Sequence, residues 1–279
     1  MKYREILKRY WGYDDFRGIQ REIIESIGNG RDTLGLMPTG GGKSITFQVP
    51  ALAEDGLCIV VTPLIALMKD QVANLRSRSI KAAAIYSGMK TADVIKALEN
   101  CIFGDYKFLY ISPERLSSEL FLTKIKKVNV RLITVDEAHC ISQWGHDFRP
   151  AYRRIGELRN LFPGVPILAL TATATPEVVK DIQQQLGFKE ENCYSMSFER
   201  KNLVYVVRYT ENKQQELFSS DSDLYCLLNW SVADEHQVTA AAGACYLVAL
   251  DLVLVKGRQN MQQPTSATTI TFIALTQDD

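Results

Sequence analysis

The chain has 279 residues, of which 46% are hydrophobic and 23% charged, and its formal net charge is zero. This composition is ordinary for a soluble globular protein of one large or two ordinary domains, and by itself it favours no function. Six cysteines are scattered without a C-x-x-C pair, at positions 58, 101, 140, 193, 226 and 245. Their spacing argues against a zinc site or a disulfide framework. With no apolar signal-peptide region at the N-terminus, we expect a cytoplasmic protein.

The zero net charge conceals an asymmetry between two parts of the chain. Residues 217–279 contain seven acidic and two basic residues and carry a net charge of −5, so residues 1–216 carry +5. A mildly basic front part is compatible with a nucleic-acid partner, but a few additional lysines more often reflect a solvated surface. The charge balance alone therefore predicts no partner.

Short apolar runs alternate with amphipathic stretches over most of the chain. Helices are expected at about Tyr3 to Tyr10 and Ile19 to Ile27. The expected strands are 33–37, 57–62, 82–86, 108–111, 132–136 and 167–171, and helices between them include 64–75, 91–103 and 176–186. Apolar strands joined by crossover helices predict an α/β fold with a mostly parallel sheet and helices on both faces. Residues 192–197 and 203–209 are expected to add strands at or near the edge of this sheet.

The pattern changes after Glu216. A Ser/Asp stretch, an Ala/Leu/Val-rich run over 240–255 and a Thr/Gln-rich end follow one another without strand-helix alternation. The apolar run is too short to span a membrane and contains Asp251, so we expect no membrane association. We predict an α/β domain over residues 1–216 and, over residues 217–279, a divergent tail that is out of frame or disordered.

A glycine-rich motif, Pro38-Thr39-Gly40-Gly41-Gly42-Lys43-Ser44, follows the first expected strand. Its glycines free the backbone to wrap a phosphate, and Lys-Ser opens a helix whose N-terminal amides point at the anion. We expect residues 39–44 to bind the phosphates of ATP. In this arrangement Lys43 holds the β- and γ-phosphates and Ser44 is a Mg²⁺ ligand.

A second motif, Asp136-Glu137-Ala138-His139, ends another apolar strand. The strand delivers two adjacent carboxylates to the carboxyl edge of the sheet, where α/β proteins bind ligands. We expect Asp136 to hold the Mg²⁺ shell and Glu137 to orient and deprotonate the attacking water. Together the two motifs predict a protein that binds and hydrolyses ATP.

Four further segments complete a recognisable set. They are Phe16-Arg17-Gly18-Ile19-Gln20, Thr62-Pro63-Leu64-Ile65-Ala66-Leu67-Met68-Lys69-Asp70-Gln71, Ile111-Ser112-Pro113-Glu114-Arg115-Leu116 and Leu168-Ala169-Leu170-Thr171-Ala172-Thr173-Ala174, and the second motif continues as Cys140-Ile141-Ser142-Gln143-Trp144-Gly145-His146-Asp147-Phe148-Arg149-Pro150. With the phosphate loop, these segments closely resemble the RecQ family of ATP-dependent DNA helicases over roughly residues 5–216. The resemblance implies a RecA-like P-loop NTPase lobe. It also implies 3′-to-5′ unwinding of DNA driven by ATP and Mg²⁺ in recombination or repair.

The resemblance implies roles for three residues ahead of the phosphate loop. Gln20 is expected to read the adenine, because its amide can donate and accept at the polar edge of the base. Tyr13 is expected to stack on the ring and Arg17 to assist. The plainer interpretation, in which Gln20 is one polar residue on a helix face, stays open here.

The most discriminating segment is the nine-residue loop after the acidic motif, which contains Trp144, His146, Phe148 and Arg149. Aromatic planes can stack on unpaired bases, and the cation can meet a phosphate. In RecQ enzymes such a loop couples DNA binding to ATP hydrolysis, so the resemblance implies single-stranded DNA, and duplex DNA with a single-stranded tail, as partners. The alternative is that the aromatic residues cap the core.

The strand-end segments are weaker signals. Thr62–Gln71 and Ser112–Arg115 can each offer backbone amides and small hydroxyls to a DNA phosphate. Thr171-Ala172-Thr173 resembles the motif that transmits the nucleotide state to a neighbouring domain. Each arrangement also suits an ordinary strand end in an α/β fold.

The resemblance ends near the linker-like run Lys213-Gln214-Gln215-Glu216-Leu217. No Gln-x-x-Gly-Arg-x-Gly-Arg run with arginine-finger candidates follows it, and no second set of lobe strands is apparent. Such an arginine contributes about three to five decades of turnover. Two alternatives therefore stay open, a non-catalytic module that binds nucleotide or DNA and, disfavoured by the aromatic loop, a fragment of an RNA helicase.

Overall fold

The computed structural model describes residues 2–145, 147–197, 203–210 and 268–275. The chain divides into two compact units, Met1–Phe198 and Glu199–Asp279. Each unit is considered by itself. The predicted division at residue 216 and the predicted origin of the tail stay predictions.

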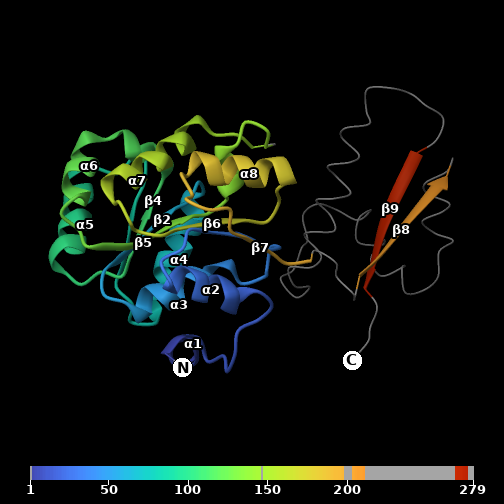
Figure 1. Ribbon diagram of the computed structural model, residues 1–279, viewed down its shortest axis with the longest axis horizontal. Coiled ribbons are helices and arrows are strands. Elements are labelled where there is room, and N and C mark those ends of the chain that lie inside the picture. The colour runs from blue at the N-terminus through green and yellow to red at the C-terminus, as the bar shows by residue number, and fades with distance from the viewer. Residues whose placement is uncertain (1, 146, 198–202, 211–267, 276–279) are drawn as a thin grey trace, which may run out of the picture. The chain divides into compact units, whose positions relative to one another are not determined.

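A parallel sheet of seven strands forms the first unit (Figure 1). Its strands are β1 (Thr33–Leu36), β2 (Leu57–Val61), β3 (Ala82–Ile85), β4 (Phe108–Ile111), β5 (Val130–Val135), β6 (Ile167–Thr171) and β7 (Cys193–Ser195), in the spatial order β3-β4-β2-β5-β6-β1-β7. Every pairing in this sheet is parallel. The carboxyl ends of β1, β6 and β5 therefore lie in a row at one edge of the sheet. The phosphate-binding motif follows β1 and the acidic motif follows β5 at this edge.

Helices cover both faces of the sheet (Figure 1). They are α1 (Lys2–Trp11), α2 (Gln20–Gly28), α3 (Lys43–Ala53), α4 (Ile65–Ser77), α5 (Thr91–Phe103), α6 (Glu119–Ile125), α7 (Glu157–Leu161) and α8 (Pro176–Gln185), with 3₁₀ turns η1 (Pro113–Ser117), η2 (Ala138–Ile141) and η3 (Pro150–Gly156). Helices α2, α3 and α4 pack on one face, α5 to α8 on the other, and α1 packs against α2 and α3. Both faces of the strands are thus removed from water.

The alternation of side chains along the strands explains why the strands read as continuous apolar runs. In β2, Leu57, Ile59 and Val61 enter one core cluster, while Cys58 and Val60 enter the cluster on the opposite face. Successive side chains of a strand point to opposite faces, so a strand buried on both sides has no polar face. All five residues are at most 1% exposed.

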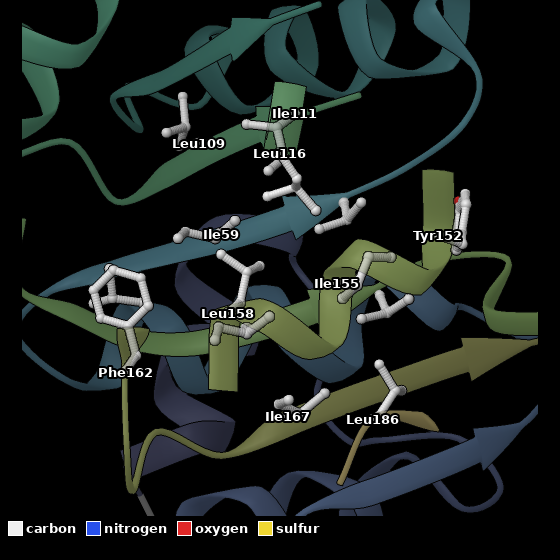
Figure 2. Packing of buried hydrophobic residues seen from close by; sticks show 14 of the residues in the cluster. Ile59, Leu109, Ile111, Leu116, Tyr152, Ile155, Leu158, Phe162, Ile167 and Leu186 are labelled. Carbon is white, nitrogen blue, oxygen red and sulfur yellow. The ribbon is translucent and has the colours of Figure 1, made fainter. Parts of the chain in front are cut away.

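The segment from η3 to α7 closes the core on the face of α5 to α8. Tyr152, Ile155 and Leu158 are fully buried. Ile155 and Leu158 lie between Ile59 of β2 and Ile167 of β6, whereas Tyr152 lies nearer the carboxyl ends of the strands (Figure 2). Burial of one such aliphatic side chain stabilises the fold by about 1.5–3 kcal/mol. This packing anchors the segment that directly follows the aromatic loop.

The predicted strands and helices of residues 1–197 are confirmed, each within two residues at either end. The elements that the pattern did not predict are short: η1, α6, η2, η3 and α7. Both η1 and η3 begin with a proline. They have five and seven residues, which is too short for a repeating pattern of apolar residues to be recognised in the sequence.

One prediction about the sheet's edge is wrong. Residues 192–197 supply β7, which pairs with β1 as expected. Residues 203–209, in contrast, form β8 (Leu203–Thr210), which pairs antiparallel with β9 (Thr268–Leu275) in a separate two-stranded sheet. The two strands pair over eight residues, and the sequence pattern alone could not identify β9 as the partner of β8.

Among the described residues, no helix is both long and apolar enough to cross a membrane.

Candidate functional site

The glycine-rich loop connects β1 to α3. Met37 at the end of β1 donates its backbone N–H to the carbonyl of Thr171 in β6, at 3.0 Å, and the loop leaves the sheet from there. Gly40 and Gly42 have φ of +82° and +77°, a left-handed conformation that side chains with a Cβ rarely adopt. Helix α3 begins at Lys43, so its free N-terminal amides face the loop. The local geometry is that of an anion-binding turn.

The acidic motif follows β5, two strands from β1. Asp136 donates its backbone N–H to the carbonyl of Val61 at 2.9 Å, which fixes the turn to the end of β2. Glu137 has φ of +48°, and its side chain turns toward the glycine-rich loop. Lys43 Nζ lies 3.4 Å from Glu137 Oε1, and the two side chains are 16% and 29% exposed. The fold thus brings together the lysine and the carboxylates that lie more than ninety residues apart in the sequence.

Several groups hold the Asp136 carboxylate in place. Its Oδ1 accepts the backbone N–H of Glu137 at 3.0 Å, and its Oδ2 accepts the hydroxyl of Thr62 at 3.4 Å. The hydroxyl of Tyr152 donates to the Asp136 carbonyl at 3.0 Å. Burial raises the pKa of Asp136, and the neighbouring charge of Glu137 raises it further, although Lys43 opposes both effects. A buried carboxylate with a raised pKa is stabilised by an additional cation, as a divalent metal would supply.

A hydrogen-bond chain joins the acidic motif to β6. His139 Nδ1 lies 2.9 Å from the hydroxyl of Thr171 and 3.4 Å from Glu137 Oε2. Thr171 Oγ1 also donates to the carbonyl of Thr173 at 3.1 Å. A hydroxyl with several available partners can change partner with little strain, so Thr171 links the orientation of His139 to the segment after β6.

Gln20 lies against the glycine-rich loop. Its side-chain amide donates to the carbonyls of Gly41 and Gly42, at 3.1 and 3.3 Å, and its Oε1 accepts the backbone N–H of Arg17 at 3.0 Å. A Cβ at Gly42 would collide with the Gln20 amide nitrogen. The residue is 5% exposed, so it is not one polar residue on a solvated helix face. Next to it, the Arg17 guanidinium lies 5.4 Å from the ring centroid of Tyr13, which is 49% exposed.

Half of the described residues of the aromatic loop (142–150) are exposed. Trp144 is 80% exposed, and its only described anchor is its backbone N–H, which donates to Ser142 Oγ at 3.2 Å. Phe148 is partly buried under the guanidinium of Arg153, which lies 5.2 Å from its ring centroid. Arg149 Nη2 pairs with Asp147 Oδ2 at 3.2 Å. His146, the fourth predicted residue of the loop, lies outside the described residues.

The segments after β2, β3 and β4 contact one another at the same edge of the sheet. Lys69 Nζ is 4.8 Å from the ring centroid of Tyr86, and the Arg115 guanidinium donates to the Tyr86 carbonyl. Leu64 and Leu67 are 45% and 50% exposed. The three strand ends therefore present cations and apolar side chains together.

A comparison with models of protein families matches residues 17–182 to the DEAD/DEAH box helicase family. The matched range contains the glycine-rich loop, the acidic motif and β1 to β6. It also covers more than half of the chain. The chain belongs to the DEAD/DEAH box helicase family.

Relatives of this DEAD/DEAH box helicase chain are RecQ helicases. It is 48% identical over 214 residues to the ATP-dependent DNA helicase RecQ of Bacillus subtilis, an alignment that covers 76% of this chain and 36% of the relative. The RecQ protein of Haemophilus influenzae is 43% identical, with 76% and 34% covered. These identities confirm the predicted RecQ resemblance. The chain spans about a third of the length of the relatives it matches.

Solved helicase structures share the fold. The helicase domain of Hef from Pyrococcus furiosus superposes with a TM-score of 0.51 at 21% identity, covering 64% of this chain and 38% of that one. The helicase MrfA, solved bound to DNA, gives a TM-score of 0.55 at 18% identity, with 70% and 29% covered. At such identities the likeness concerns the fold, and it confirms the predicted RecA-like α/β class.

The sequence did not indicate the roles of three groups in the candidate site. Thr62 begins the segment that is expected to offer amides and hydroxyls to a DNA phosphate, and its hydroxyl donates to Asp136. His139 and Tyr152 were given no role, yet one contacts Glu137 and the other fixes the Asp136 backbone. The positions of Thr62 and His139 could have been found from the spatial order of the strands, which places β2 beside β5 and β6 beside β5. The sequence does not state that order.

Proposed function

We propose that the chain provides the ATP-binding motor lobe of a RecQ-type DNA helicase, in which ATP hydrolysis drives movement along DNA and unwinding. One observation carries the proposal, the 3.4 Å approach of Lys43 to Glu137 where the glycine-rich loop meets the Asp136-Glu137 turn. A phosphate-binding loop and paired carboxylates at one sheet edge are the parts that phosphoryl transfer requires. The relatives named ATP-dependent DNA helicases align with this chain over 36% and 34% of their own length.

Residues 39–44 bind the ATP phosphates in this proposal. The amides at the start of α3 and the ammonium of Lys43 face the anion, while Ser44 and Asp136 ligate Mg²⁺. The bound Mg²⁺ neutralises charge that develops on the phosphates. The raised pKa of Asp136 supports this assignment, because a carboxylate that is costly to ionise alone gains from a metal beside it.

Glu137 positions and deprotonates the attacking water. In the described state its carboxylate accepts Lys43 on one oxygen and lies near His139 on the other. When Lys43 binds phosphate instead, Glu137 Oε1 loses that partner and becomes available to the water. His139 and Thr171 then hold the other oxygen, so that the carboxylate keeps its orientation.

Gln20 reads the adenine, with Tyr13 stacking on the base and Arg17 assisting. Its amide already lies between α2 and the glycine-rich loop. Adenine binding would exchange at least one carbonyl contact of the amide for the base. Binding of adenine would thereby change the hydrogen bonds between Gln20 and the backbone that holds the phosphates.

The aromatic loop binds single-stranded DNA. The exposed ring of Trp144, the partly buried ring of Phe148 and the Arg149 cation form a stacking and charged surface that starts seven residues after the catalytic turn. We assign the same role to His146. The described loop has aromatic side chains in water, which an unpaired base would cover, so single-stranded DNA is favoured over a folded duplex.

The nucleotide assignment is tested by equilibrium binding of a fluorescent ATP analogue with Mg²⁺. Lys43→Ala removes charge-assisted hydrogen bonds worth about 1.5–3 kcal/mol, so affinity is expected to fall about 10- to 150-fold. Lys124→Ala, which removes an ion pair to Glu99 remote from the site, is the matched control and is expected to bind as wild type does. Equal affinity in wild type and Lys43→Ala would refute the phosphate assignment.

The choice of nucleic acid is tested by comparing single-stranded DNA with RNA of the same sequence. The RecQ-type proposal expects DNA to stimulate ATP turnover more than RNA does. Stimulation by RNA alone would favour the RNA helicase alternative. Binding of nucleotide and DNA without turnover would favour the non-catalytic module, and the expected cytoplasmic location stays a prediction.

A further inference from the structure

Three side chains of different chemistry converge at the end of the acidic motif. They are His139, Cys140 and Asp147, each of which offers one ligand atom, and these atoms all lie within 4.8 Å of one another. Cys140 Sγ is 3.8 Å from His139 Nε2 and 3.6 Å from Asp147 Oδ2. The backbone brings them together, because the N–H of Arg149 donates to the Cys140 carbonyl at 2.9 Å and folds the aromatic loop back over η2.

The spacing of these atoms fits a tetrahedral metal. Zinc binds thiolate at about 2.3 Å and imidazole or carboxylate at about 2.0–2.2 Å, so tetrahedral ligand atoms lie about 3.4–3.6 Å apart. The two separations from Cys140 Sγ, 3.8 and 3.6 Å, are within a few tenths of an ångström of that range, and the pair of His139 and Asp147, which lies within 4.8 Å, would close on binding the cation. Three protein ligands with a fourth position open to water is the arrangement of an exchangeable zinc site.

His139 Nδ1, the nitrogen that would not bind the metal, contacts polar partners as it does in metal-binding histidines. Nδ1 lies 2.9 Å from the Thr171 hydroxyl and 3.4 Å from Glu137 Oε2. A ligating imidazole typically donates its other N–H to such a carboxylate or polar oxygen, which fixes the tautomer and the orientation of the ring. That remaining nitrogen is the one directed at Cys140.

We propose that His139 Nε2, Cys140 Sγ and Asp147 Oδ2 form a binding site for a thiophilic divalent cation of the zinc class, separate from the Mg²⁺ position at Ser44 and Asp136. A thiolate, an imidazole and one carboxylate suit zinc, whereas Mg²⁺ prefers oxygen ligands alone. Cys140 is fully buried, but the Asp147 side chain is 48% exposed and gives the cation a path from solvent.

Occupation of this site changes the aromatic loop. Asp147 Oδ2 accepts both Arg149 Nη2 and the Cys140 thiol, so a cation bound at that oxygen takes the place of both partners. The thiol proton leaves to solvent as the metal–sulfur bond forms, and Arg149 loses its ion pair. The cation also joins the DNA-binding loop to His139, which contacts Glu137. We expect zinc to lower DNA-stimulated ATP turnover, a consequence that rests on the proposed function.

Binding itself is tested with Co²⁺, which reports a thiolate ligand through a near-ultraviolet charge-transfer band. The background is the full chain with Cys193, Cys226 and Cys245 all changed to Ser, which leaves three cysteines that are buried in the fold. We expect one Co²⁺ per chain with the charge-transfer band and the visible bands of tetrahedral cobalt, and displacement by an equivalent of Zn²⁺. Absence of the band in this background would overturn the proposal.

Single changes in that background assign the ligands. Cys140→Ser is expected to abolish the band, and Asp147→Asn, at an exposed position that folding tolerates, to weaken binding and alter the visible bands. Thr171→Val, which removes one of the two contacts of His139 Nδ1, is expected to weaken zinc binding about 10- to 100-fold. A band that survives Cys140→Ser would overturn the proposal. Unchanged binding in Asp147→Asn would also overturn it, and this second test does not depend on whether Cys140→Ser folds.

The effect on activity is measured separately. Zinc is expected to lower DNA-stimulated turnover in the triple-Ser background and to have less effect in Asp147→Asn. Absence of any turnover would refute the proposed function while the cobalt spectra still decided the metal site. Equal zinc sensitivity in the background and in Asp147→Asn would overturn the regulatory consequence.

Discussion

The Asp136-Glu137 turn and the aromatic loop are neighbours in the sequence but differ in how the fold holds them. The turn is fixed by backbone contacts to β2 and by the hydroxyls of Thr62 and Tyr152, and it lies against Lys43. In the loop, Trp144 is 80% exposed and is anchored through its backbone. One region is organised before any ligand arrives, whereas the other presents aromatic surface that a ligand must cover.

The difference assigns separate tasks to the two regions. A preorganised carboxylate pair can stabilise charge in a transition state without reorganisation, as phosphoryl transfer demands. An exposed ring contributes little until a base stacks on it. The contact between Cys140 and Asp147 joins the two regions, and in the proposed function it would transmit DNA binding at the loop to the turn. Changes in the turn should therefore alter chemistry, and changes in the loop should alter coupling.

The largest effect is expected from Glu137→Gln, which removes the base while keeping the shape of the turn. Loss of a general base lowers the rate about 10²- to 10⁴-fold. Steady-state ATP turnover should fall by that factor, and the affinity for ATP with Mg²⁺ should stay close to that of wild type. Turnover equal to wild type would show that the turn does not perform the chemistry.

Trp144→Ala tests the loop. Removal of one stacking ring costs about 1–3 kcal/mol, so affinity for single-stranded DNA should fall about 5- to 150-fold while ATP affinity is unchanged. Phe103→Ala, at a ring that is 83% exposed at the end of α5, is the matched control and should leave DNA binding unchanged. Equal losses in both variants would mean that Trp144 has no particular part in DNA binding.

Asp136→Asn has the smallest expected effect and tests the cause of the raised pKa of Asp136. Burial and the charge of Glu137 raise the pKa of Asp136 in the folded chain, so the ionised carboxylate destabilises the fold. This free-energy penalty is complete above the raised pKa and vanishes below the ordinary pKa of 3.8. At neutral pH, without metal or nucleotide, Asp136→Asn should therefore unfold at a higher temperature than wild type. The difference should shrink as the pH falls through the folded-state pKa.

Addition of Mg²⁺ and ATP should reverse that order. The metal compensates the Asp136 charge in wild type, whereas the amide of the variant offers a weaker ligand. Thermal unfolding measured with and without Mg²⁺-ATP gives both comparisons. A variant that is less stable than wild type without ligand would contradict the assigned cause of the raised pKa.

The fold was largely predictable because its signals are local. Apolar strands that end in Gly-Lys-Ser or Asp-Glu, separated by amphipathic helices, identify the elements within two residues. The fate of residues 203–209 was not predictable, because their partner β9 lies about sixty residues further along and the sequence does not state which strands pair.

The candidate site was predictable in its parts but not in its contacts. Lys43, Asp136 and Glu137 were identified from motifs, and the structure brings them together. The hydroxyl of Thr62, the Nδ1 contact of His139 and the convergence of Cys140 with Asp147 depend on strand order and on the fold of the loop. The cysteine spacing argued against a zinc site, since a ligand set built from one cysteine, one histidine and one carboxylate has no spacing signature.

We infer that the Asp136-Glu137 turn performs ATP chemistry and that the aromatic loop couples this chemistry to DNA. Steady-state ATP turnover of the purified chain, with and without single-stranded DNA and beside Glu137→Gln, tests it most directly. We predict turnover above that of the variant and a further rise with DNA that Glu137→Gln abolishes. Turnover equal to that of Glu137→Gln in both conditions would contradict the claim and leave a module that only binds.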